Sequence, residues 1–571
     1  MLKKIKNILI PYNLKIVPVF ALMLISNLFE VISIGSIIPL LAIITDQGFY
    51  NSNMYVEYFI NNIYYLDENQ FIIACFILLL AAFFFRFIFV SITIWVKNNF
   101  TYHVQKDVSQ KLLKKYMFKN YSFFFKENTA TLINNVDKES HHFVVGILSP
   151  IIILMIEFFA IIFILSFLFY YDPLSTISIF MVIISFSLIF IYLTRERLSF
   201  LGIQRKIDEN SINKILIEGF SGIKDIKLVQ AENFFLKKFS KKIKNLCTVL
   251  AKQKTIDELS RPIFEFISIL CLIILLMYLY LIDKNLSEIF IILGIFLAAS
   301  LRLLPSANRV ITSIQSIRFY KTTVDIIYKE LIEGKSDSFN SNNTKTLEFE
   351  NSINIENLTF CYPGTKKIIL ENANLNISKG ETIGVFGESG SGKTTLVDLL
   401  SGFLKPDKGK ILCDENDISN LIIGWRKLIG YVPQSIFIID DTIKNNICLG
   451  LADNEIDESS LKYSIDKSQL EKLINSLPEG YNSLVGDKGI GLSLGQIQRI
   501  GIARALYWQK PIIIFDESTS SLDPQNEKEI MNDIKKLKGK KTIIIISHKK
   551  EVLDNCDKVY MIDKKKFIQV N

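Results

Sequence analysis

Residues 387–395, which read GESGSGKTT, have the composition and spacing of a loop that binds phosphate. Glycines let the backbone wrap closely around phosphate oxygens, with successive N–H groups pointing inward. The ammonium of Lys393 would neutralise charge on the β- and γ-phosphates, and the hydroxyl of Thr394 would be a ligand of Mg²⁺. The sequence therefore predicts a nucleotide site that contains Mg²⁺.

The segments on either side of this loop can position it. Residues 381–386 (ETIGVF) predict a short buried strand, and residues 395–400 (TLVDLL) predict the first turns of a helix. A helix N-terminus adds partial positive charge to the backbone donors of the loop. The residues of the loop expected to contact the nucleotide are Gly387, Glu388, Ser389, Gly390, Ser391, Gly392, Lys393, Thr394 and Thr395.

Two acids follow another predicted strand. Residues 512–515 are four apolar residues, and Asp516 and Glu517 come directly after them. Nucleotide chemistry needs an acid in the shell of the Mg²⁺ ion and a group that orients water. Asp516 suits the first role, and Glu517 suits a general base that polarises water.

Residues 353–571 resemble the ATPase domain of ABC transporters, because the landmarks of that family occur here in the family's order. The phosphate loop and the acid pair are two of these landmarks. The others are Tyr362, the YVPQ segment that ends at Gln434, the LSLGQ signature at residues 492–496, the SLD segment that ends at Asp523, and His548. The resemblance implies an α/β P-loop ATPase domain that binds ATP and Mg²⁺ and hydrolyses ATP.

The resemblance also implies roles for these residues. Tyr362 would stack on adenine, and His548 would contact the γ-phosphate. Gln434 would contact Mg²⁺ and the attacking water and would report to the membrane helices. The catalytic candidates are Glu517, His548 and Gln434, and the metal-binding candidates are Thr394, Gln434 and Asp516.

The signature segment implies a homodimer. In the family this segment closes over the ATP bound to the opposite subunit, so one chain cannot complete a site. The residues that would reach across, together with the D-loop residue, are Ser493, Gly495, Gln496 and Asp523. Leu494 departs from the usual Leu-Ser-Gly-Gly-Gln pattern, since it stands where the family has glycine. Its side chain could crowd the approach, and a positive φ there would be unfavourable.

The composition points to a membrane rather than to nucleic acid. Half of the 571 residues are apolar, and the mean hydropathy is +0.30. The net charge of +8 comes largely from basic residues that flank apolar segments, so nucleic-acid binding is not expected. The seven cysteines are scattered without a C-x-x-C motif, so neither a disulfide framework nor a zinc site is indicated. The N-terminus lacks a cleavage site and is interpreted as a cytoplasmic lead-in.

Six apolar segments are long enough to cross a bilayer, which needs about 20 residues. They lie at residues 16–44, 70–96, 143–170, 174–194, 263–282 and 286–305. The loop 46–69 has no Lys or Arg, whereas the stretches 97–126 and 195–261 are basic. These two stretches and both termini are therefore expected in the cytosol. They also look helical, which predicts that the spans continue as long cytosolic extensions.

The predicted fold is thus an α-helical membrane domain of six transmembrane helices with long cytosolic extensions, followed by the ATPase domain. The expected boundaries are residues 1–333 for the membrane domain, 334–350 for a polar linker and 351–571 for the ATPase domain. This arrangement, and the segment 485–489 (VGDKG), resembles ABC exporters. Residues 54–65 of the outer loop predict either an interfacial helix with an aromatic face or a plain loop packed on the bundle.

Ionisable residues within the spans are candidates for cargo binding. Arg86, Arg302 and Arg309 could line a cavity for an anionic head group such as pyrophosphate, because the guanidinium fork suits phosphate. Alternatively, Glu30 and Glu157 pair with Arg86 and Arg302 inside the bundle. The arginines and the aromatic outer loop resemble PglK-type flippases. That resemblance implies ATP-driven movement of a polyprenyl-pyrophosphate-linked oligosaccharide to the outer leaflet of the bacterial inner membrane.

Two alternatives remain open at this stage. One is an ABC exporter of lipid A, peptides or hydrophobic drugs. The other is a membrane-anchored regulatory ATPase that transports nothing, against which the nearly complete set of catalytic residues argues.

Overall fold

The computed structural model describes nine segments of the chain, which are residues 1–36, 68–171, 173–281, 286–333, 347–365, 367–486, 489–517, 524–554 and 556–570. The chain divides into two compact units. One comprises Met1–Phe118 and Glu127–Lys335, and the other comprises Lys119–Lys126 and Ser336–Asn571.

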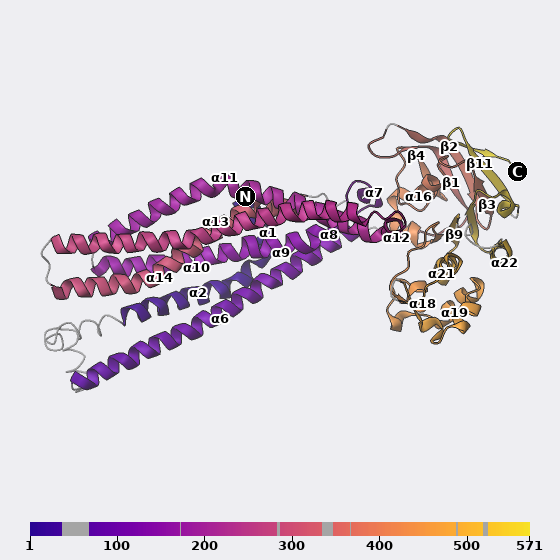
Figure 1. Ribbon diagram of the computed structural model, residues 1–571. Helices are drawn as coiled ribbons and strands as arrows, with labels where there is room; N and C mark the ends of the chain where they lie inside the picture. The colour runs from indigo at the N-terminus through magenta and orange to yellow at the C-terminus, as the bar shows by residue number, and fades with distance from the viewer. Residues whose placement is uncertain are drawn as a thin grey trace. The chain divides into compact units, whose positions relative to one another are not determined.

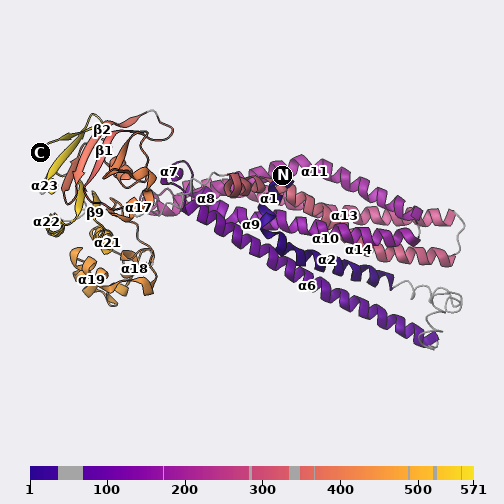
Figure 2. The same ribbon diagram turned by 180° about the vertical axis from the view of Figure 1, so that it is seen from behind.

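The first unit is helical. Its long helices run side by side, as Figures 1 and 2 show from opposite sides. They are α2 (Asn13–Gly35), α6 (Glu68–Met117), α10 (Ser149–Tyr171), α11 (Pro173–Ser221), α13 (Glu232–Leu281) and α14 (Leu286–Phe319). The shorter ones are α1 (Leu2–Leu9), α8 (Thr129–Asn134), α9 (Ser140–Phe143), α12 (Ile223–Leu228) and α15 (Lys321–Tyr328).

The helices continue well beyond the predicted spans, as expected. Three of them, α6, α11 and α13, have 50, 49 and 50 residues. At about 1.5 Å per residue such a helix is more than twice as long as a hydrocarbon core is thick. The long apolar segments and their polar continuations therefore form single continuous helices.

Helical residues occur in each of the six ranges predicted to cross a membrane, although residues 37–44 of the first range lie outside the described chain. By length and composition, three stretches of the described residues qualify as spans: Leu2–Ser33, Ile72–Met117 and Thr129–Tyr170. The number six stays a prediction. Residues 46–67 of the outer loop, residue 172 and residues 282–285 also lie outside the described residues.

A buried polar cluster joins three helical elements of this unit. It was not predicted from the sequence. Arg205 of α11 and Glu139 are fully buried, with 3.5 Å between guanidinium and carboxylate. Glu139 belongs to a π-helical turn at Asn135–Glu139, and its carboxylate accepts a hydrogen bond from Thr323 of α15. The guanidinium also lies over the ring of Tyr320, 4.6 Å from its centroid. A buried cation is tolerated only with such partners, so this cluster ties α11 and α15 to the turn.

The second unit contains two main sheets. The antiparallel sheet has the order β2-β1-β4-β5, and the larger one has the order β12-β11-β3-β10-β9-β6. Five strands of the larger sheet are parallel neighbours, and β12 is antiparallel at its edge. The strands are β1 (Ser352–Cys361), β2 (Ile368–Ser378), β3 (Thr382–Phe386), β4 (Lys408–Cys413), β5 (Asn416–Asp417), β6 (Ile429–Val432), β7 (Asp441–Thr442), β8 (Leu484–Val485), β9 (Ile512–Asp516), β10 (Thr542–Ile546), β11 (Lys558–Asp563) and β12 (Lys566–Gln569).

The parallel sheet explains why the predicted strands are so apolar. Every residue of β9 and β10 is buried, as is usual for parallel strands covered on both faces. The strands predicted at residues 381–386 and 512–515 are confirmed as β3 and β9. The adjacent strands β6, β9, β10 and β3 end at one edge, so the loops that follow them meet there.

Helices complete the second unit. α16 (Lys393–Leu400) follows β3, and α21 (Leu494–Tyr507) precedes β9. α21 shares an apolar core with α18 and α19, which lie with it in a helical part of the unit (Figure 1). The remaining helices are α7 (Tyr121–Phe124), α17 (Ile422–Lys427), α18 (Ile443–Ile447), α19 (Glu458–Lys467), α20 (Glu471–Ser476), α22 (Pro524–Lys535) and α23 (Lys550–Leu553).

Candidate functional site

The phosphate loop joins β3 to α16, as its sequence predicts. Gly390 and Gly392 have φ of +80° and +108°, which side chains other than hydrogen rarely allow. A Cβ on Gly392 would also lie 2.9 Å from Ile369 Cγ2. Lys393 Nζ donates to the carbonyls of Gly387 (2.8 Å) and Glu388 (3.0 Å), so the ammonium lies within the loop.

The loop fits a phosphate group. The hydroxyl of Ser391 is buried and has no hydrogen-bond partner among the described residues. A buried hydroxyl without a partner is unfavourable unless a ligand or water satisfies it. With the ammonium of Lys393 beside it and the start of α16 behind it, the loop offers the donors that an anion requires.

Asp516 ends β9 and is 3% exposed. Its Oδ2 accepts a hydrogen bond of 3.3 Å from the hydroxyl of Tyr431. Burial, and then the neighbouring charge of Glu517, raise the pKa of Asp516 to about 6. Asp398 of α16 lies close by, and burial followed by the charge of Asp516 raises its pKa to about 6 as well. A site that raises the pKa of two acids in this way gains stability when a cation neutralises them, which fits Mg²⁺.

Glu517 is the point on which several predicted residues converge. Gln434 Nε2 donates to Glu517 Oε2 at 3.0 Å. His548 Nδ1 lies 3.8 Å from the same oxygen, and Lys393 Nζ lies 4.0 Å from Oε1. The structure thus gathers these four residues beside Asp516 at the carboxyl edge of the parallel sheet.

The backbone of Glu517 is strained. Its φ is +47°, which is uncommon for a residue other than glycine. The strain is held by the hydrogen bond from Glu517 N to Ile546 O of β10, at 2.9 Å. Strained residues that the surrounding structure holds in place cluster at active sites. A carboxylate held in this way, next to a cation site, can accept a proton from water.

Tyr362 and Thr395 form a second contact at the loop. The Tyr362 hydroxyl and Thr395 Oγ1 are 3.1 Å apart. The Tyr362 ring meets Phe360 and Phe125 edge to face, with centroid distances of 5.3 and 5.9 Å. Its predicted stacking on adenine stays a prediction.

The signature residues begin α21. Ser493 is the N-cap: its Oγ accepts from Gln496 N (3.3 Å), and its own N–H donates to Gln496 Oε1 (2.8 Å). This is a reciprocal capping box. Leu494 is 62% exposed and is not among the described residues with positive φ. Because Leu494 is the first residue of a regular helix, the unfavourable positive φ does not arise at this position.

The structure describes the side-chain surroundings of some predicted cargo residues but not of others. Arg86 is half-buried, with its guanidinium 5.7 Å from the Phe83 ring centroid. Arg309 Nε donates to Glu157 Oε1 at 2.6 Å, and Glu157 is buried whereas Arg309 is 46% exposed. The side chains of Glu30 and Arg302, and the residue Asp523, lie outside the described part of the chain.

Sequence reasoning missed three residues of the ATPase unit. Tyr431 and Asp398 are near Asp516, and Tyr121 of α7 contacts Phe403. Tyr431 lies in the segment leading to Gln434, so its position near the nucleotide site was predictable. Its hydrogen bond to Asp516 was not predictable. The turn near Tyr121–Thr131 was expected to be a place where a soluble domain could dock, but Phe403 was not predicted as the partner of Tyr121.

Two family profiles match the chain. The profile described as "ABC transporter transmembrane region" matches residues 19–301, and the one described as "ABC transporter" matches residues 370–520. A solved structure described as a bacterial Atm1-family ABC exporter with ATP bound has a TM-score of 0.83 at 17% identity, covering 97% of this chain and 94% of that one. This likeness shows the fold.

Two curated relatives match about four fifths of the chain, and a third matches a smaller part. The ATP-dependent lipid A-core flippase of Alkalilimnicola ehrlichii is 28% identical over 474 residues, which are 82% of this chain and 79% of that protein. The protein of the same name from Ralstonia nicotianae is 26% identical over 469 residues, 81% and 78% of the two chains. The alpha-hemolysin translocation ATP-binding protein HlyB of Escherichia coli is 38% identical over 223 residues, which are 39% and 31% of the two chains.

Proposed function

Because the chain belongs to the ABC transporters, as a half-transporter of the exporter type, we propose that two copies form a flippase for a phosphorylated glycolipid of the lipid A-core kind. The chain is an ATP hydrolase coupled to transport, with ATP and Mg²⁺ at its ATPase domain. It resides in the cytoplasmic membrane, with the ATPase domain in the cytosol. The cargo and the dimer are the proposed parts.

The cargo proposal rests on how much of this chain each relative matches. Proteins named lipid A-core flippases match about four fifths of this chain, including the transmembrane region. HlyB matches only 39% of it. Since cargo is recognised in the membrane region, a relative that matches across both units is the better guide to cargo.

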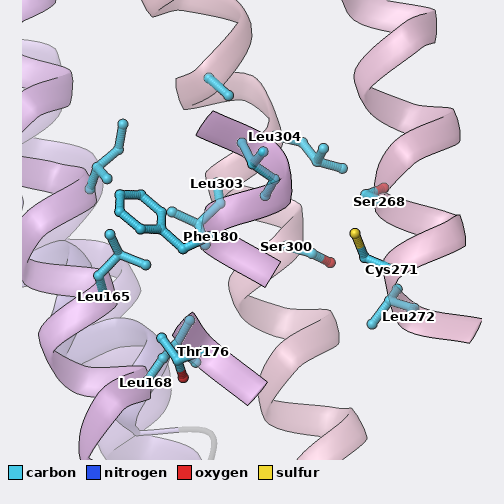
Figure 3. A pocket seen from close by; sticks show the side chains of 13 residues that line it. Leu165, Leu168, Thr176, Phe180, Ser268, Cys271, Leu272, Ser300, Leu303 and Leu304 are labelled. Atoms are coloured by element: carbon cyan, nitrogen blue, oxygen red, sulfur yellow. The ribbon is translucent and has the colours of Figure 1, made fainter. Parts of the chain in front are cut away.

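A cavity in the membrane region supports a lipid cargo (Figure 3). It has a volume of about 80 Å³ and lies between α10, α11, α13 and α14. Leu165, Phe180 and Leu303 point into it in Figure 3. Two of its polar residues, Ser268 and Ser300, turn their hydroxyls to carbonyls of their own helices, at 2.9 and 2.8 Å. An apolar cavity of this size can hold a short part of a hydrocarbon chain.

Arg309 supports a phosphorylated head group. It follows the last predicted span and is partly exposed. One guanidinium N–H is used by Glu157, and the remaining donors of the fork can reach a phosphate. Arg86 and Arg302 are proposed to act with it.

We propose the following roles at the nucleotide. Lys393 and the loop amides hold the phosphates, Tyr362 stacks on adenine, and Thr394 and Asp516 hold Mg²⁺. Bound Mg²⁺ supplies charge neutralisation at the transferring phosphate. Glu517 accepts a proton from the attacking water, which Gln434 orients, and His548 contacts the γ-phosphate. The second copy closes the site with Ser493, Gly495, Gln496 and Asp523.

A polyprenyl-pyrophosphate-linked oligosaccharide is the second candidate cargo. The observation that favours it is the set of arginines, which suits pyrophosphate through paired donors. Both candidates present phosphate to the protein, and they differ in the lipid tail and the glycan.

Reconstitution of the full-length chain into proteoliposomes distinguishes these cargoes. The probes are fluorescent lipid A and a fluorescent undecaprenyl-pyrophosphate-linked oligosaccharide, with ATP and Mg²⁺, and Glu517→Gln as the inactive control. We expect ATP-dependent movement of lipid A between leaflets that the control lacks. Movement of the pyrophosphate lipid alone would favour the second candidate. Hydrolysis without movement of either lipid, or stimulation by hydrophobic drugs alone, would overturn the proposal.

A further inference from the structure

Gln469 has a strained backbone at the end of α19. Its φ is +56°, a left-handed conformation that is unfavourable for most residues other than glycine. Its N–H donates to Asp466 O at 3.0 Å, and the next N–H, that of Leu470, donates to Ile465 O at 3.0 Å. This pair of bonds is a common end of a helix, in which glycine usually takes the left-handed position. A strained residue persists where the surrounding structure holds it, so the contacts of this glutamine show what holds it.

The backbone carbonyl of Gln469 is bound by the helix that begins with the signature residues. Arg499 Nη1 donates to Gln469 O at 2.7 Å. Arg499 lies on α21, about one turn after Gln496 of the capping box that begins this helix. A hydrogen bond from a charged group is stronger than one between neutral groups. The turn after α19 is therefore tied to the helix that presents the signature.

The side chain of Gln469 is bound to a second helix, α22. Its Nε2 donates to Asp533 Oδ2 at 3.1 Å, and Lys536 Nζ donates to Asp533 Oδ1 at 2.7 Å. Burial acts to raise the pKa of Asp533, but the hydrogen bonds from Lys536 and Gln469 act against it, and the pKa lies below its usual value. The carboxylate is therefore ionised at neutral pH and is a strong acceptor. In sequence, α22 begins at Pro524, directly after Asp523 of the SLD segment.

The contacts of Gln469 lie at the signature end of α21, beside a groove. Further along, α21 and α22 contribute to one apolar core, which includes Leu506 and Ile530. Near the signature, the groove has a volume of about 1040 Å³, and Ser493, Gln469 and Asp533 all line it. Hydrogen bonds through Gln469 thus join the two helices at the end where shared apolar packing gives way to a groove.

We propose that Gln469 is a positioning residue that fixes the signature end of α21 to α22, so that the signature and the SLD segment reach the ATP of the partner copy together. This inference rests on the shared site proposed above. The contacts with Arg499 and Asp533 do not involve the phosphate loop, so Gln469 should act on closure over the nucleotide rather than on its initial binding. Without the bond to Asp533, the signature end of α21 could turn independently of α22, and closing the site would then require ordering it.

Three substitutions separate the contacts of Gln469. Gln469→Gly keeps the carbonyl that Arg499 binds, suits the positive φ and removes the side-chain bond to Asp533. Asp533→Ala removes the same bond from the other side. Gln469→Lys restores a donor that can reach Asp533 and serves as the rescue variant. Since glycine is the usual residue at such a helix end, we expect Gln469→Gly to fold normally.

Gln509→Gly is the matched control. Gln509 lies just after α21 and has a φ of +49°. Its Nε2 donates to Ser460 Oγ at 3.2 Å, and its carbonyl accepts from Lys541 Nζ at 2.8 Å. The substitution therefore removes a similar side-chain bond and relieves a similar strain in the same unit, while the bond between Gln469 and Asp533 stays in place.

The experiment uses the full-length chain in lipid nanodiscs with ATP and Mg²⁺. The ATP concentration that gives half-maximal hydrolysis reports on closure of the site. The affinity for a fluorescent ADP analogue reports on the phosphate loop, because ADP lacks the γ-phosphate over which the signature is proposed to close. Neither readout needs the cargo, so failure of the cargo proposal leaves this test intact.

We expect Gln469→Gly and Asp533→Ala each to raise the half-maximal ATP concentration roughly three- to tenfold, the effect of losing one hydrogen bond. The affinity for the ADP analogue should stay unchanged. The double variant should be no worse than either single variant, since both remove the same bond. Gln469→Lys should restore the original value, and Gln509→Gly should keep it.

Three results would overturn the positioning role of Gln469. The first is an unchanged ATP dependence in Gln469→Gly, or an equal loss in Gln509→Gly. The second is a double variant in which the effects of the two single variants add up. The third is an equal loss of affinity for the ADP analogue, which would place the effect at the phosphate loop instead.

Mixed dimers locate the nucleotide on which Gln469 acts. When a Lys393→Ala chain is paired with a chain that keeps Lys393, the one intact site combines the phosphate loop of the second chain with the signature of the first. Gln469→Gly should then raise the half-maximal ATP concentration only when it is placed in the Lys393→Ala chain. An effect in neither arrangement would overturn the positioning role. An effect only in the other chain would overturn the shared site on which the proposal rests.

Discussion

At the scale of single residues, the surroundings of Leu494 and Arg309 in the structure change the expected effect of substituting them. Leu494 begins a regular helix and exposes its side chain, so it affects what approaches the helix rather than the helix itself. Arg309 is tied to a buried carboxylate, so removing it does more than remove a candidate cargo contact.

Leu494→Gly should leave the ATPase rate unchanged or raise it. The change removes bulk from the face that is proposed to close on the partner's nucleotide, while glycine in a helix costs about 1 kcal/mol of stability at most. The rate at saturating ATP and the unfolding temperature check this. Leu494→Ala is the control, because it removes the bulk without loosening the backbone. A marked fall in rate with both variants would contradict the expectation.

Arg309→Ala should destabilise the membrane region by up to about 3–5 kcal/mol, since the buried carboxylate of Glu157 would lose this ion pair. The Glu157→Gln/Arg309→Gln double variant removes both charges and should recover most of this loss, as measured by thermal unfolding in detergent. A stable double variant that no longer moves lipid A would support a cargo role for Arg309. Full transport by that variant would limit Arg309 to neutralising Glu157.

At the scale of elements, a close crossing between two helices determines how the long helices pack against each other. α11 crosses the end of α14 at Gly202, where an added Cβ would lie 1.9 Å from the carbonyl oxygen of Phe319. The cluster around Arg205 lies one turn further along α11. The two features together fix α11 against the segment that joins α14 to α15.

Gly202→Ala should destabilise the helical unit by about 1–3 kcal/mol or more, because backbone must move to admit the methyl group. Gly219→Ala on the same helix is the matched control: its Cβ would lie 3.7 Å from Phe235 Cδ1, an ordinary contact. For Gly219→Ala we expect the stability of the helical unit to rise by about 0.5–1 kcal/mol, since alanine favours the helix. Thermal unfolding of both variants measures the difference, and equal effects would show that the crossing is not tight.

At the scale of the whole molecule, the proposed site is shared between two copies, and mixed dimers test that. A Lys393→Ala chain and a Ser493→Arg chain should each be inactive alone. Co-expressed with two tags and purified as mixed dimers, they should regain up to about half of the ATPase activity, because one of the two symmetric sites is then intact.

The control places both substitutions in one chain and pairs it with an unsubstituted chain. If the signature acts across the dimer, this pair has no intact site and stays inactive. If it acted within its own chain, this second pair would be active and the first pair would not, which would refute the shared site.

The sequence by itself determined the local parts of this protein. The strand, loop and helix at residues 381–400 and the strand before Asp516 were predictable, because consecutive residues create these features. The long helical extensions were predictable for the same reason, since they follow from continuous helical pattern.

Only the tertiary structure decided which distant residues meet. Gln434, His548 and Lys393 converge on Glu517 because four parallel strands end at one edge. Spans that are apolar on every side carry no periodicity to orient them, so the pairing of Glu157 with Arg309 could not be read from sequence. The contact of Tyr121 with Phe403 likewise depends on packing between segments far apart in the chain, which no local pattern encodes.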